Sequence, residues 1–319
     1  ETLMNKKFIL AIDLGTTGCR SILFDERLHA VSSGYREYGL ITPCEKWVEQ
    51  DAELWWQLTQ ETVREAVGAA SVKENQITGI SVSSQGITII PVDKQFAPLH
   101  NAISWLDVRA EEQAECLSRD FGNRAIFTLT GKPINAAYSL PKILWLKKHE
   151  PVVFHSAWKF LMPMDFIIGK LTGNCVTDHT MASGTLLYDI KAKTWSTRIL
   201  QKYGLSADQL PALKWSGEVA GALTEEAAKA LRLKKGCTVA VGAQDQRCAS
   251  LAVGLREGVM TISLGTSGAI CKYWDEPRTE GDTRIGWSAY VNEGSWVTEG
   301  VVNTAAASLR WLRDTMFPE

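Results

Sequence analysis

The sequence predicts an α/β fold, and two observations lead to this class. First, apolar runs rich in β-branched residues alternate with segments whose apolar residues recur at helical spacing. Second, a short strand–turn–strand unit occurs twice, as LGTTG at 14–18 and as LGTSG at 264–268. The chain has 319 residues, of which 45% are hydrophobic, so it can bury a sizeable core and form two domains.

Four segments are predicted to be strands. The apolar run at 7–15 ends on a glycine turn, and residues 20–38 are typical of two strands joined by a turn at Asp25–Glu26. Residues 77–93 are β-branched and alternate in polarity, and residues 237–245 form an apolar strand that ends in polar side chains.

Four further segments are predicted to be helices. Apolar residues recur at helical spacing over 51–67, where Asp51 can cap the first turn. The segment 139–151 has an apolar helical face, with Ser139 as the expected N-cap. Helices are also expected at 225–233 and 302–314.

Charge and cysteine content exclude several classes of protein. The 34 Lys and Arg against 36 Asp and Glu give a net charge of −2, so no nucleic acid or anionic membrane is expected as a partner. The seven cysteines are scattered and never spaced C-x-x-C, which favours reduced thiols over disulfides or zinc. Asp13 interrupts the first apolar run too early for a secretory signal, and no segment is apolar enough to span a membrane. We therefore expect a cytoplasmic protein.

The repeated loop belongs to a longer repeat. With an offset of 250 residues, ILAIDLGTTGCRSILFDER aligns with VMTISLGTSGAICKYWDEP, and the agreement continues through the second strand and its turn. We interpret this as a duplicated β-hairpin, although two unrelated hairpins with glycine turns remain an alternative. Glycines let a backbone approach a ligand closely, and N–H groups with Thr or Ser hydroxyls can hold an anion.

The two copies differ where Asp13 stands in the first and Ser263 in the second. A carboxylate beside a phosphate site is repelled unless a divalent cation intervenes, so Asp13 is the candidate ligand for Mg²⁺, through water. Neither the P-loop pattern nor the dinucleotide-binding glycine pattern occurs in the sequence.

Several segments together resemble the FGGY carbohydrate kinases. They are AIDLGTTGCRSILFD, WVEQDAELWW, NAISWLDVRAEEQAE, KILWLKKH, VGAQDQRCASLAVGL and SLGTSGA, in the order of the family and over essentially the whole chain. The resemblance implies the duplicated ribonuclease H-like fold of actin, Hsp70 and hexokinase. It also implies phosphorylation of a sugar or polyol hydroxyl by Mg²⁺-bound ATP, in a cleft between two domains.

The resemblance implies a division of the chain at about residue 250. Residues 1–250 are expected to form the N-terminal FGGY domain, with the sugar site, the first phosphate loop and the catalytic aspartate. Residues 251–319 are expected to begin the nucleotide-binding second domain, which is shorter here than in the family and is therefore predicted to be truncated.

The resemblance also implies roles for individual residues. Asp245, in GAQDQ, is the expected catalytic base, and Asp13 lies near the metal. The nucleotide phosphates are expected to contact Gly15, Thr16, Thr17 and Arg20 in the first loop and Gly265, Thr266 and Ser267 in the second. From the residues alone, Asp245 ends an apolar strand and precedes a helix, where active-site groups of α/β sheets lie, but it could also serve only as a helix N-cap.

The expected sugar-binding residues are Gln85, Trp105, Asp107, Asp245 and Gln246. Each has an alternative: Trp105 could pack in the core, and Asp107 could open a helix together with Arg109. Gly86 and Ile87 depart from the family, because glycerol kinases have Arg-Glu and xylulose kinases Met-His at this point. This departure leaves room for a larger or differently placed substrate.

Three functions remain open. The favoured one is a carbohydrate kinase that uses ATP and Mg²⁺, with a sugar or polyol as its small-molecule partner and with a homodimer allowed. The second is an actin- or Hsp70-like ATPase with protein partners, against which the tryptophan-rich segments argue. The third is a catalytically idle relative that binds sugar or nucleotide, against which the presence of both Asp13 and Asp245 argues.

Overall fold

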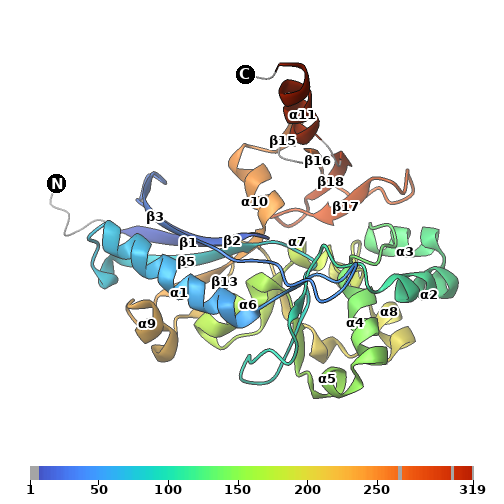
Figure 1. Ribbon diagram of the computed structural model, residues 1–319, viewed down its shortest axis with the longest axis horizontal. Helices are drawn as coiled ribbons and strands as arrows, with labels where there is room; N and C mark the ends of the chain where they lie inside the picture. Colours follow the sequence, from blue (N-terminus) through green and yellow to red (C-terminus); the bar gives the residue numbers. More distant parts are fainter. Residues whose placement is uncertain (1–6, 265–267, 303–304, 318–319) are drawn as a thin grey trace.

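Two β-sheets and a group of helices make up the molecule, which is described here from a computed structural model covering residues 7–264, 268–302 and 305–317 (Figure 1). The first sheet has six strands in the order β13-β14-β5-β1-β2-β3. The bounds of these strands are β1 Phe8–Leu14, β2 Gly18–Phe24, β3 Ala30–Glu37, β5 Ile77–Ser84, β13 Val219–Ala222 and β14 Thr238–Gln244. β1, β5 and β14 run parallel, whereas β2, β3 and β13 each pair antiparallel to their neighbours.

Alternation along β1 decides which face of this sheet is covered. Phe8, Leu10, Ile12 and Leu14 are buried, whereas Ile9 and Asp13 between them are exposed. Successive side chains of a strand point to opposite faces. Two helices, α1 Ala52–Ala69 and α6 Pro163–Thr172, pack on the buried side of the sheet, and α9 Glu225–Leu231 packs against both of them (Figure 1). Asp13 therefore projects from the face that β1 leaves open.

Most of the long segment between β5 and β14 forms a helical group at the end of the molecule away from β3 (Figure 1), whereas β13 and α9 from the same segment belong to the first sheet and the helices beneath it. The helices of the group are α2 Glu111–Phe121, α3 Asn123–Thr130, α4 Ser139–His149, α5 Pro151–Ser156, α7 His179–Ala182 and α8 Thr197–Tyr203, besides α6. Short two-stranded ladders tie it together: β4 Glu49–Gln50 with β7 Ala102–Ile103, β6 Ile90–Val92 with β8 Lys159–Leu161, β9 Val176–Asp178 with β12 Ala212–Lys214, and β10 Tyr188–Asp189 with β11 Thr194–Trp195. Single 3₁₀ turns lie at Glu74–Gln76 and Ala207–Gln209.

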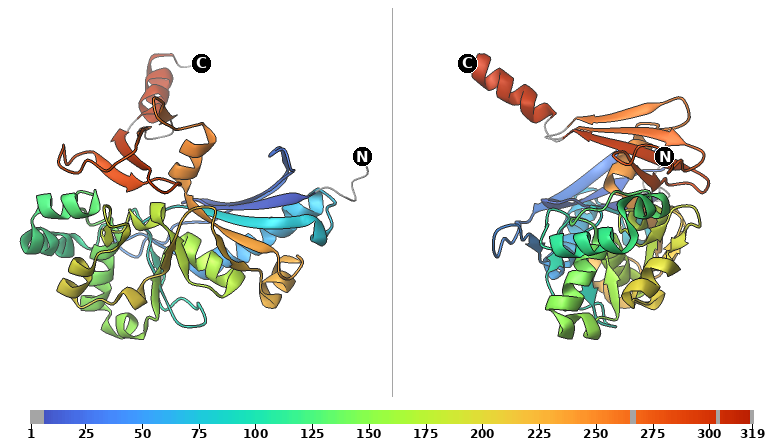
Figure 2. Two further views of the ribbon diagram at one scale, coloured as in Figure 1. Left: turned by 180° about the vertical axis from the view of Figure 1, so that it is seen from behind. Right: turned by 90° about the vertical axis from the view of Figure 1, so that its right-hand side faces the viewer.

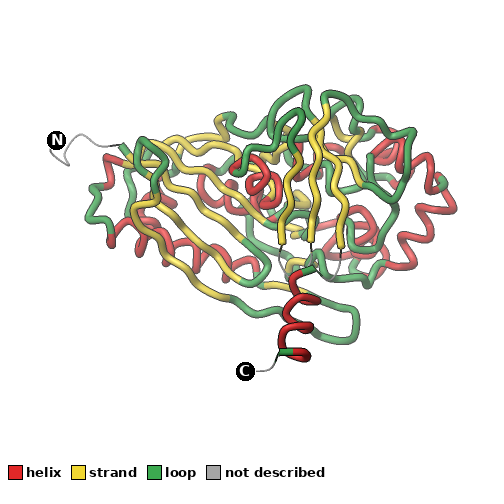
Figure 3. Tube along the Cα trace, turned by 90° about the horizontal axis from the view of Figure 1, so that it is seen from above, coloured by secondary structure: helices red, strands yellow, loops and turns green. Residues whose placement is uncertain are grey.

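After α10, Asp245–Ala252, the chain enters a second, antiparallel sheet in the order β15-β16-β18-β17. Its strands are β15 Met260–Leu264, β16 Gly268–Trp274, β17 Gly286–Ala289 and β18 Trp296–Val302, followed by α11 Ala306–Met316. Figure 2 shows this sheet on top of the first part of the molecule, and Figure 3 shows its strands grouped apart from those of the first sheet.

The duplicated hairpin predicted from the sequence is confirmed. β1 ends at Leu14 and β15 at Leu264, and the following strands begin at Gly18 and Gly268, as the offset of 250 residues requires. The two copies pair antiparallel but differ in register by one residue, because Leu14 lies opposite Cys19 whereas Leu264 lies opposite Gly268.

Most buried apolar residues form one core under the first sheet and through the helical group, and a smaller cluster lies under the second sheet. The second sheet is joined to the first part through β17. The Trp287 N–H donates to the Gly131 carbonyl at 2.7 Å, and the Ala289 N–H donates to the Ser183 hydroxyl at 2.9 Å. The predicted boundary at residue 250 falls within α10 and remains a prediction.

Two local predictions differ from the structure. The strand expected over 77–93 is broken after Ser84, and Ile87 has a φ of +53°, an unfavourable value for a β-branched residue. Ser139 is the first residue of α4 and not its N-cap, and its hydroxyl donates to the Ile87 carbonyl at 3.3 Å. In both cases a contact distant in sequence replaces the expected local pattern.

Two further observations bear on the predicted class of protein. No helix in the described part of the chain is both long and apolar enough to cross a membrane. All seven cysteines are free.

The cap of α1 provides a first test of the fold. Asp51 accepts hydrogen bonds from the N–H groups of Glu53 at 2.9 Å and Leu54 at 3.2 Å. The Asp51→Ala variant should lose about 1 kcal/mol of unfolding free energy, because these N–H groups lose their partner. Urea unfolding followed by circular dichroism measures the change. Asp51→Asn retains a capping oxygen and should stay within a few tenths of native, and equal losses in the two variants would contradict the assignment.

Candidate active site

A cavity of about 600 Å³ lies between the carboxyl ends of the parallel strands and the second sheet. It collects residues that are far apart in the sequence. The lining residues are Thr16, Gln85, Gly86, Ile87, Trp105, Lys132, Tyr138, Thr180, Gly184, Gln244, Asp245, Gln246, Arg247, Ala269, Ser288 and Glu299. Five of the sequence-predicted site residues are therefore brought together: Thr16, Gln85, Trp105, Asp245 and Gln246.

Asp245 is the first residue of α10 and follows β14 directly. Just before it, the pairing of β14 with β5 shifts between Val241 and Gln244. Gly242 permits this bulge, because a Cβ there would collide with the Val82 carbonyl of β5. Gln244 is the N-cap, so Asp245 is not the capping residue that the alternative interpretation proposed. The bulge ends the strand where Asp245 enters the cavity.

The Asp245 carboxyl is half-buried and has an altered acidity. Its pKa is raised to about 6, chiefly by burial and also by the nearby charge of Asp13, while the N–H of Gln246, donating at 2.6 Å, opposes the rise. A carboxylate with such a pKa is ionised at neutral pH and yet basic enough to accept a proton in a reaction.

Asp13 lies near Asp245, because the parallel strands β1 and β14 end at the same edge of the first sheet. Asp13 as a whole is exposed to solvent. The protein atoms around its carboxyl group nevertheless remove part of its hydration, which raises the pKa of Asp13 above the usual value. Ser83, its register partner on β5, and Arg20, its register partner on β2, oppose the rise. Two neighbouring carboxylates suit a divalent cation that keeps several waters, as Mg²⁺ does. Among the described residues, however, no three His, Cys, Asp or Glu side chains group to hold a metal.

The first glycine loop is held by side chains from other elements. The Gly15 carbonyl accepts from the Tyr38 hydroxyl at 2.5 Å, and the Thr16 carbonyl accepts from Gln50 Nε2 at 2.9 Å. Among the residues that the structure describes, no backbone carbonyl accepts a hydrogen bond from the N–H groups of Thr16 and Thr17. The loop therefore offers donors toward a ligand while its carbonyls are bonded.

Two other nucleotide contacts, Thr17 and Arg20, are predicted in this first hairpin. Thr17 and Arg20 are exposed, and the Arg20 guanidinium lies 4.9 Å from the Tyr35 ring centre. The predicted second loop, Gly265, Thr266 and Ser267, lies outside the described residues.

Gln85 and Trp105 are connected to the first loop. Gln85 Nε2 donates to Gln50 Oε1 at 2.9 Å, and Trp105 Nε1 donates to the Thr16 hydroxyl at 2.9 Å. Gln85 Oε1 is buried and has no hydrogen-bond partner among the described residues, so it is an acceptor available to a ligand. Trp105 is 38% exposed and is not a core residue. The sequence did not single out Gln50, although it lies in the quoted segment WVEQDAELWW.

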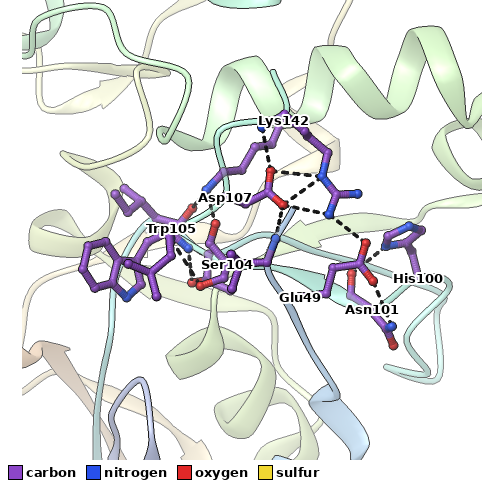
Figure 4. A network of polar contacts seen from close by, with 12 residues as sticks. Glu49, His100, Asn101, Ser104, Trp105, Asp107 and Lys142 are labelled. Atoms are coloured by element: carbon purple, nitrogen blue, oxygen red, sulfur yellow. Dashed lines mark hydrogen bonds and ion pairs between the residues drawn. The ribbon is translucent and has the colours of Figure 1, made fainter. Parts of the chain in front are cut away.

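Asp107 does not line the cavity, contrary to what the resemblance implied. It is fully buried, accepts from the Val48 N–H at 2.6 Å and forms an ion pair with Arg109 at 2.7 Å. Figure 4 shows this network, in which Arg109 Nη2 also contacts Glu49 Oε1 at 2.7 Å. The Arg109 guanidinium stacks 3.8 Å from the Trp47 ring centre. Asp107 thus orients Arg109 and leaves no free oxygen for a sugar.

Lys142 links two of the loops that line the cavity, and Figure 4 shows it beside Ser104. Its ammonium group is buried and donates to the carbonyls of Ser104 at 2.6 Å and Ile87 at 3.4 Å. Burial lowers the pKa of Lys142 to about 7. Because Ile87 and Trp105 both line the cavity, Lys142 links the loop after β5 to the loop after β7. Lys142, Lys132, Tyr138, Arg247 and Glu299 carried no recognisable local signal in the sequence.

The sheet order, the hairpin repeated in a second sheet and the cavity at the strand ends define a protein of the ribonuclease H-like class to which actin, Hsp70 and hexokinase belong. Residues 8–252 match the N-terminal domain of the FGGY family of carbohydrate kinases, and the chain belongs to this family. The predicted family and fold class are thereby confirmed.

Several known proteins resemble this chain. The xylulose kinase of Bacillus subtilis is 33% identical over 313 residues, which are 98% of this chain and 62% of that protein. The glycerol kinase of Thermococcus kodakarensis is 31% identical over 97% of this chain and 62% of that protein. The crystal structure of a ligand-bound xylulose kinase from Lactobacillus acidophilus superposes with a TM-score of 0.91 at 28% identity, covering 98% of this chain and 63% of that one. The chain thus spans less than two thirds of these relatives.

The buried network around Arg109 predicts a large effect on stability. Arg109→Ala leaves Glu49 and Asp107 buried without their cation and should cost about 3–5 kcal/mol. Urea unfolding measures the loss. The matched control is Arg36→Ala, which removes exposed pairs with Glu61 and Glu65 at 3.1 and 2.6 Å and should cost less than about 1 kcal/mol. Similar losses in both variants would show that burial does not set the cost.

Asp245 predicts a distinct pH dependence of stability. Because its pKa rises to about 6 on folding from 3.8, it stabilises the folded chain below pH 4, and this contribution is lost as the pH rises through 6. The Asp245→Asn variant should therefore be more stable than native at pH 7 by about 3 kcal/mol, with the difference shrinking toward pH 4.

The measurement is urea unfolding at intervals from pH 4 to pH 7. Asp25→Asn is the contrast, because the backbone N–H groups of His29 and Arg27 lower the pKa of Asp25. That variant should gain no stability at pH 7. An Asp245→Asn variant that is less stable than native at pH 7 would contradict the predicted shift.

Proposed function

We propose that this chain belongs to an enzyme that transfers the terminal phosphoryl group of ATP to a hydroxyl of a sugar or polyol. The observation that carries the proposal is Asp245, a half-buried carboxylate with a pKa of about 6 that faces a cavity of about 600 Å³ beside a glycine–threonine loop. The names of the relatives, which are kinases for xylulose, glycerol and gluconate, support the same reaction class.

In this proposal Asp245 is the general base. It accepts the proton of the substrate hydroxyl as the oxygen attacks the γ-phosphorus, and the bond from that phosphorus to the bridging oxygen of ADP breaks. The pKa of about 6 suits this role, because the carboxylate is ionised at pH 7.

The phosphates would bind at the first loop, through the N–H groups and hydroxyls of Thr16 and Thr17 with Gly15 and Arg20. The second loop, Gly265, Thr266 and Ser267, would contact the nucleotide from the other side. Asp13 would hold Mg²⁺ through water, and the cation supplies neutralisation of the phosphate charge. Asp13 beside Asp245 supports this assignment, since the pair of carboxylates repel each other without a cation.

The sugar would occupy the part of the cavity next to Asp245. Gln85 Oε1, buried and unpartnered, would accept a hydrogen bond from one hydroxyl, and the exposed Trp105 ring would cover the apolar face of the sugar. Gln246, which follows the base, would contact a further hydroxyl. Gly86 lines the cavity, and a Cβ there would lie 3.3 Å from the Gln244 side chain, which also lines it.

We place the reaction in the cytoplasm, where ATP is available and where seven free cysteines stay reduced. A homodimer remains a prediction.

The test combines ligand binding with turnover in the 319-residue chain. A panel of pentuloses, hexuloses, aldonates, alditols and glycerol, each with and without Mg²⁺–ADP, should contain a compound that raises the melting temperature. ATP should then be consumed only when that compound is present. Asp245→Asn should lower turnover by more than about 10³-fold and keep the shift caused by Mg²⁺–ADP, since the base acts in the chemical step.

The matched control is Asp208→Asn, an exposed residue outside the cavity, which should keep native turnover. Consumption of ATP that does not depend on any sugar would favour an ATPase of the actin and Hsp70 kind. Binding without turnover in the native chain would favour a catalytically idle relative.

A further inference from the structure

Lys132 lies on the wall of the cavity that faces the second sheet. It follows α3 and Gly131, which has a φ of +73° and packs so closely on Trp287 that a Cβ would lie 2.8 Å from that side chain. The Lys132 ammonium is buried and donates to the Ser288 hydroxyl of β17 at 2.7 Å. The position of Lys132 is therefore fixed by the contact between the two parts of the molecule.

This ammonium group has no carboxylate partner among the described residues. Glu299 is the acidic residue whose charge raises the pKa of Lys132, but its carboxylate forms an ion pair with Arg247 at 2.8 Å. Lys132 forms no ion pair within 4.0 Å in the part of the chain that the structure describes. The groups whose charges act on it are Arg247, Glu299 and Cys271, and Asp245 is not one of them. This wall thus carries one uncompensated positive charge.

Burying an ammonium group without a counter-charge is costly, and the pKa of Lys132 falls to about 8 as a result. An ammonium has three donors, of which the Ser288 hydroxyl takes one. Gly286 packs closely against the group, because a Cβ there would lie 3.3 Å from Lys132 Nζ. Arg247 Nε is likewise buried and has no hydrogen-bond partner within the described part of the chain. Donors and positive charge are therefore available to a ligand on this side of the cavity.

We propose that the sugar substrate carries a carboxylate, as an aldonate does, and that the Lys132 ammonium binds this carboxylate while a hydroxyl of the same molecule faces Asp245. The inference rests on the proposed function and adds the chemical class of the substrate. A charge-assisted hydrogen bond in a water-poor site would favour the acid over a neutral sugar of the same length. Lys132 is then a specificity-determining residue, and its positive charge lies at the other end of the cavity from the two negatively charged aspartates.

The test uses pairs of compounds that differ only in the carboxylate. D-gluconate is compared with D-glucitol, D-galactonate with galactitol, and D-xylonate with xylitol, by calorimetric titration of the 319-residue chain at pH 7. At least one acid should bind tenfold or more tightly than its polyol. Lys132→Met should abolish this difference and change the affinity for the polyol less than threefold. The exposed Lys235→Met is the matched control and should keep the difference.

The pairwise comparison in the native chain tests the inference even where Lys132→Met fails to fold, and Lys132→Gln, which can still donate to Ser288, is the second variant. A polyol or other neutral sugar that binds as tightly as every acid overturns the inference and leaves the proposed function standing. Equal losses for acid and polyol in Lys132→Met also overturn it, since Lys132 would then act only in packing. Weaker binding of Mg²⁺–ADP with an unchanged preference for the acid would assign Lys132 to the nucleotide phosphates instead. If neither sugars nor acids bind, the proposed function fails as well.

Discussion

The parallel pairing of β1, β5 and β14 is the constraint on which the rest of the structure depends. Leu14 of β1 and Gln244 of β14 both lie opposite Ser84 of β5, so the three strands end side by side. The residues at or just beyond these ends are Asp13, Gln85 and Asp245, which come from three separate parts of the sequence. Since the carboxyl ends of parallel strands share one edge, the register alone brings both carboxylates and the buried amide to one place.

The loops beyond that edge are held by buried charges and not by secondary structure. Arg109 joins Glu49 to Asp107, and Lys142 joins the carbonyls of Ile87 and Ser104. A buried charge is tolerated only where hydrogen bonds and counter-charges satisfy it, so these contacts have strict geometry. They hold Ile87 at an unfavourable φ of +53° and position Trp105 next to the first glycine loop.

Charge is distributed unevenly across the cavity. Asp13 and Asp245 lie at the edge of the first sheet, where the charge of Asp13 raises the pKa of Asp245. Lys132 and Arg247 lie on the side of the second sheet, where Glu299 balances only one of them. A cation beside the aspartates and an anionic group beside Lys132 would balance both ends. The proposed metal and the proposed acidic substrate therefore follow from the same physical requirement.

The sequence alone determined the features that depend on local patterns. Periodicity located the strands of the repeated hairpin and the helix at Ala52–Ala69, and Asp51 was identified as its cap because capping is a contact over two or three residues. The sequence also predicted the position of Asp245 between a strand and a helix. It predicted membership of the family as well, because the motifs that identify the family occur in order along the chain.

Only the tertiary structure decided the contacts between distant segments. Asp107 was expected at the sugar and instead neutralises Arg109, which also pairs with Glu49, a residue 60 positions away. Lys132 reaches Ser288 over 156 positions, and nothing near either residue indicates this contact. The break after Ser84 depends on Lys142 and Ser139 holding the Ile87 carbonyl. The spacing of apolar residues along the chain indicates which face of a helix or strand is buried. The partner of a buried charge depends instead on how separate helices and strands pack, so it can be identified only in the folded chain.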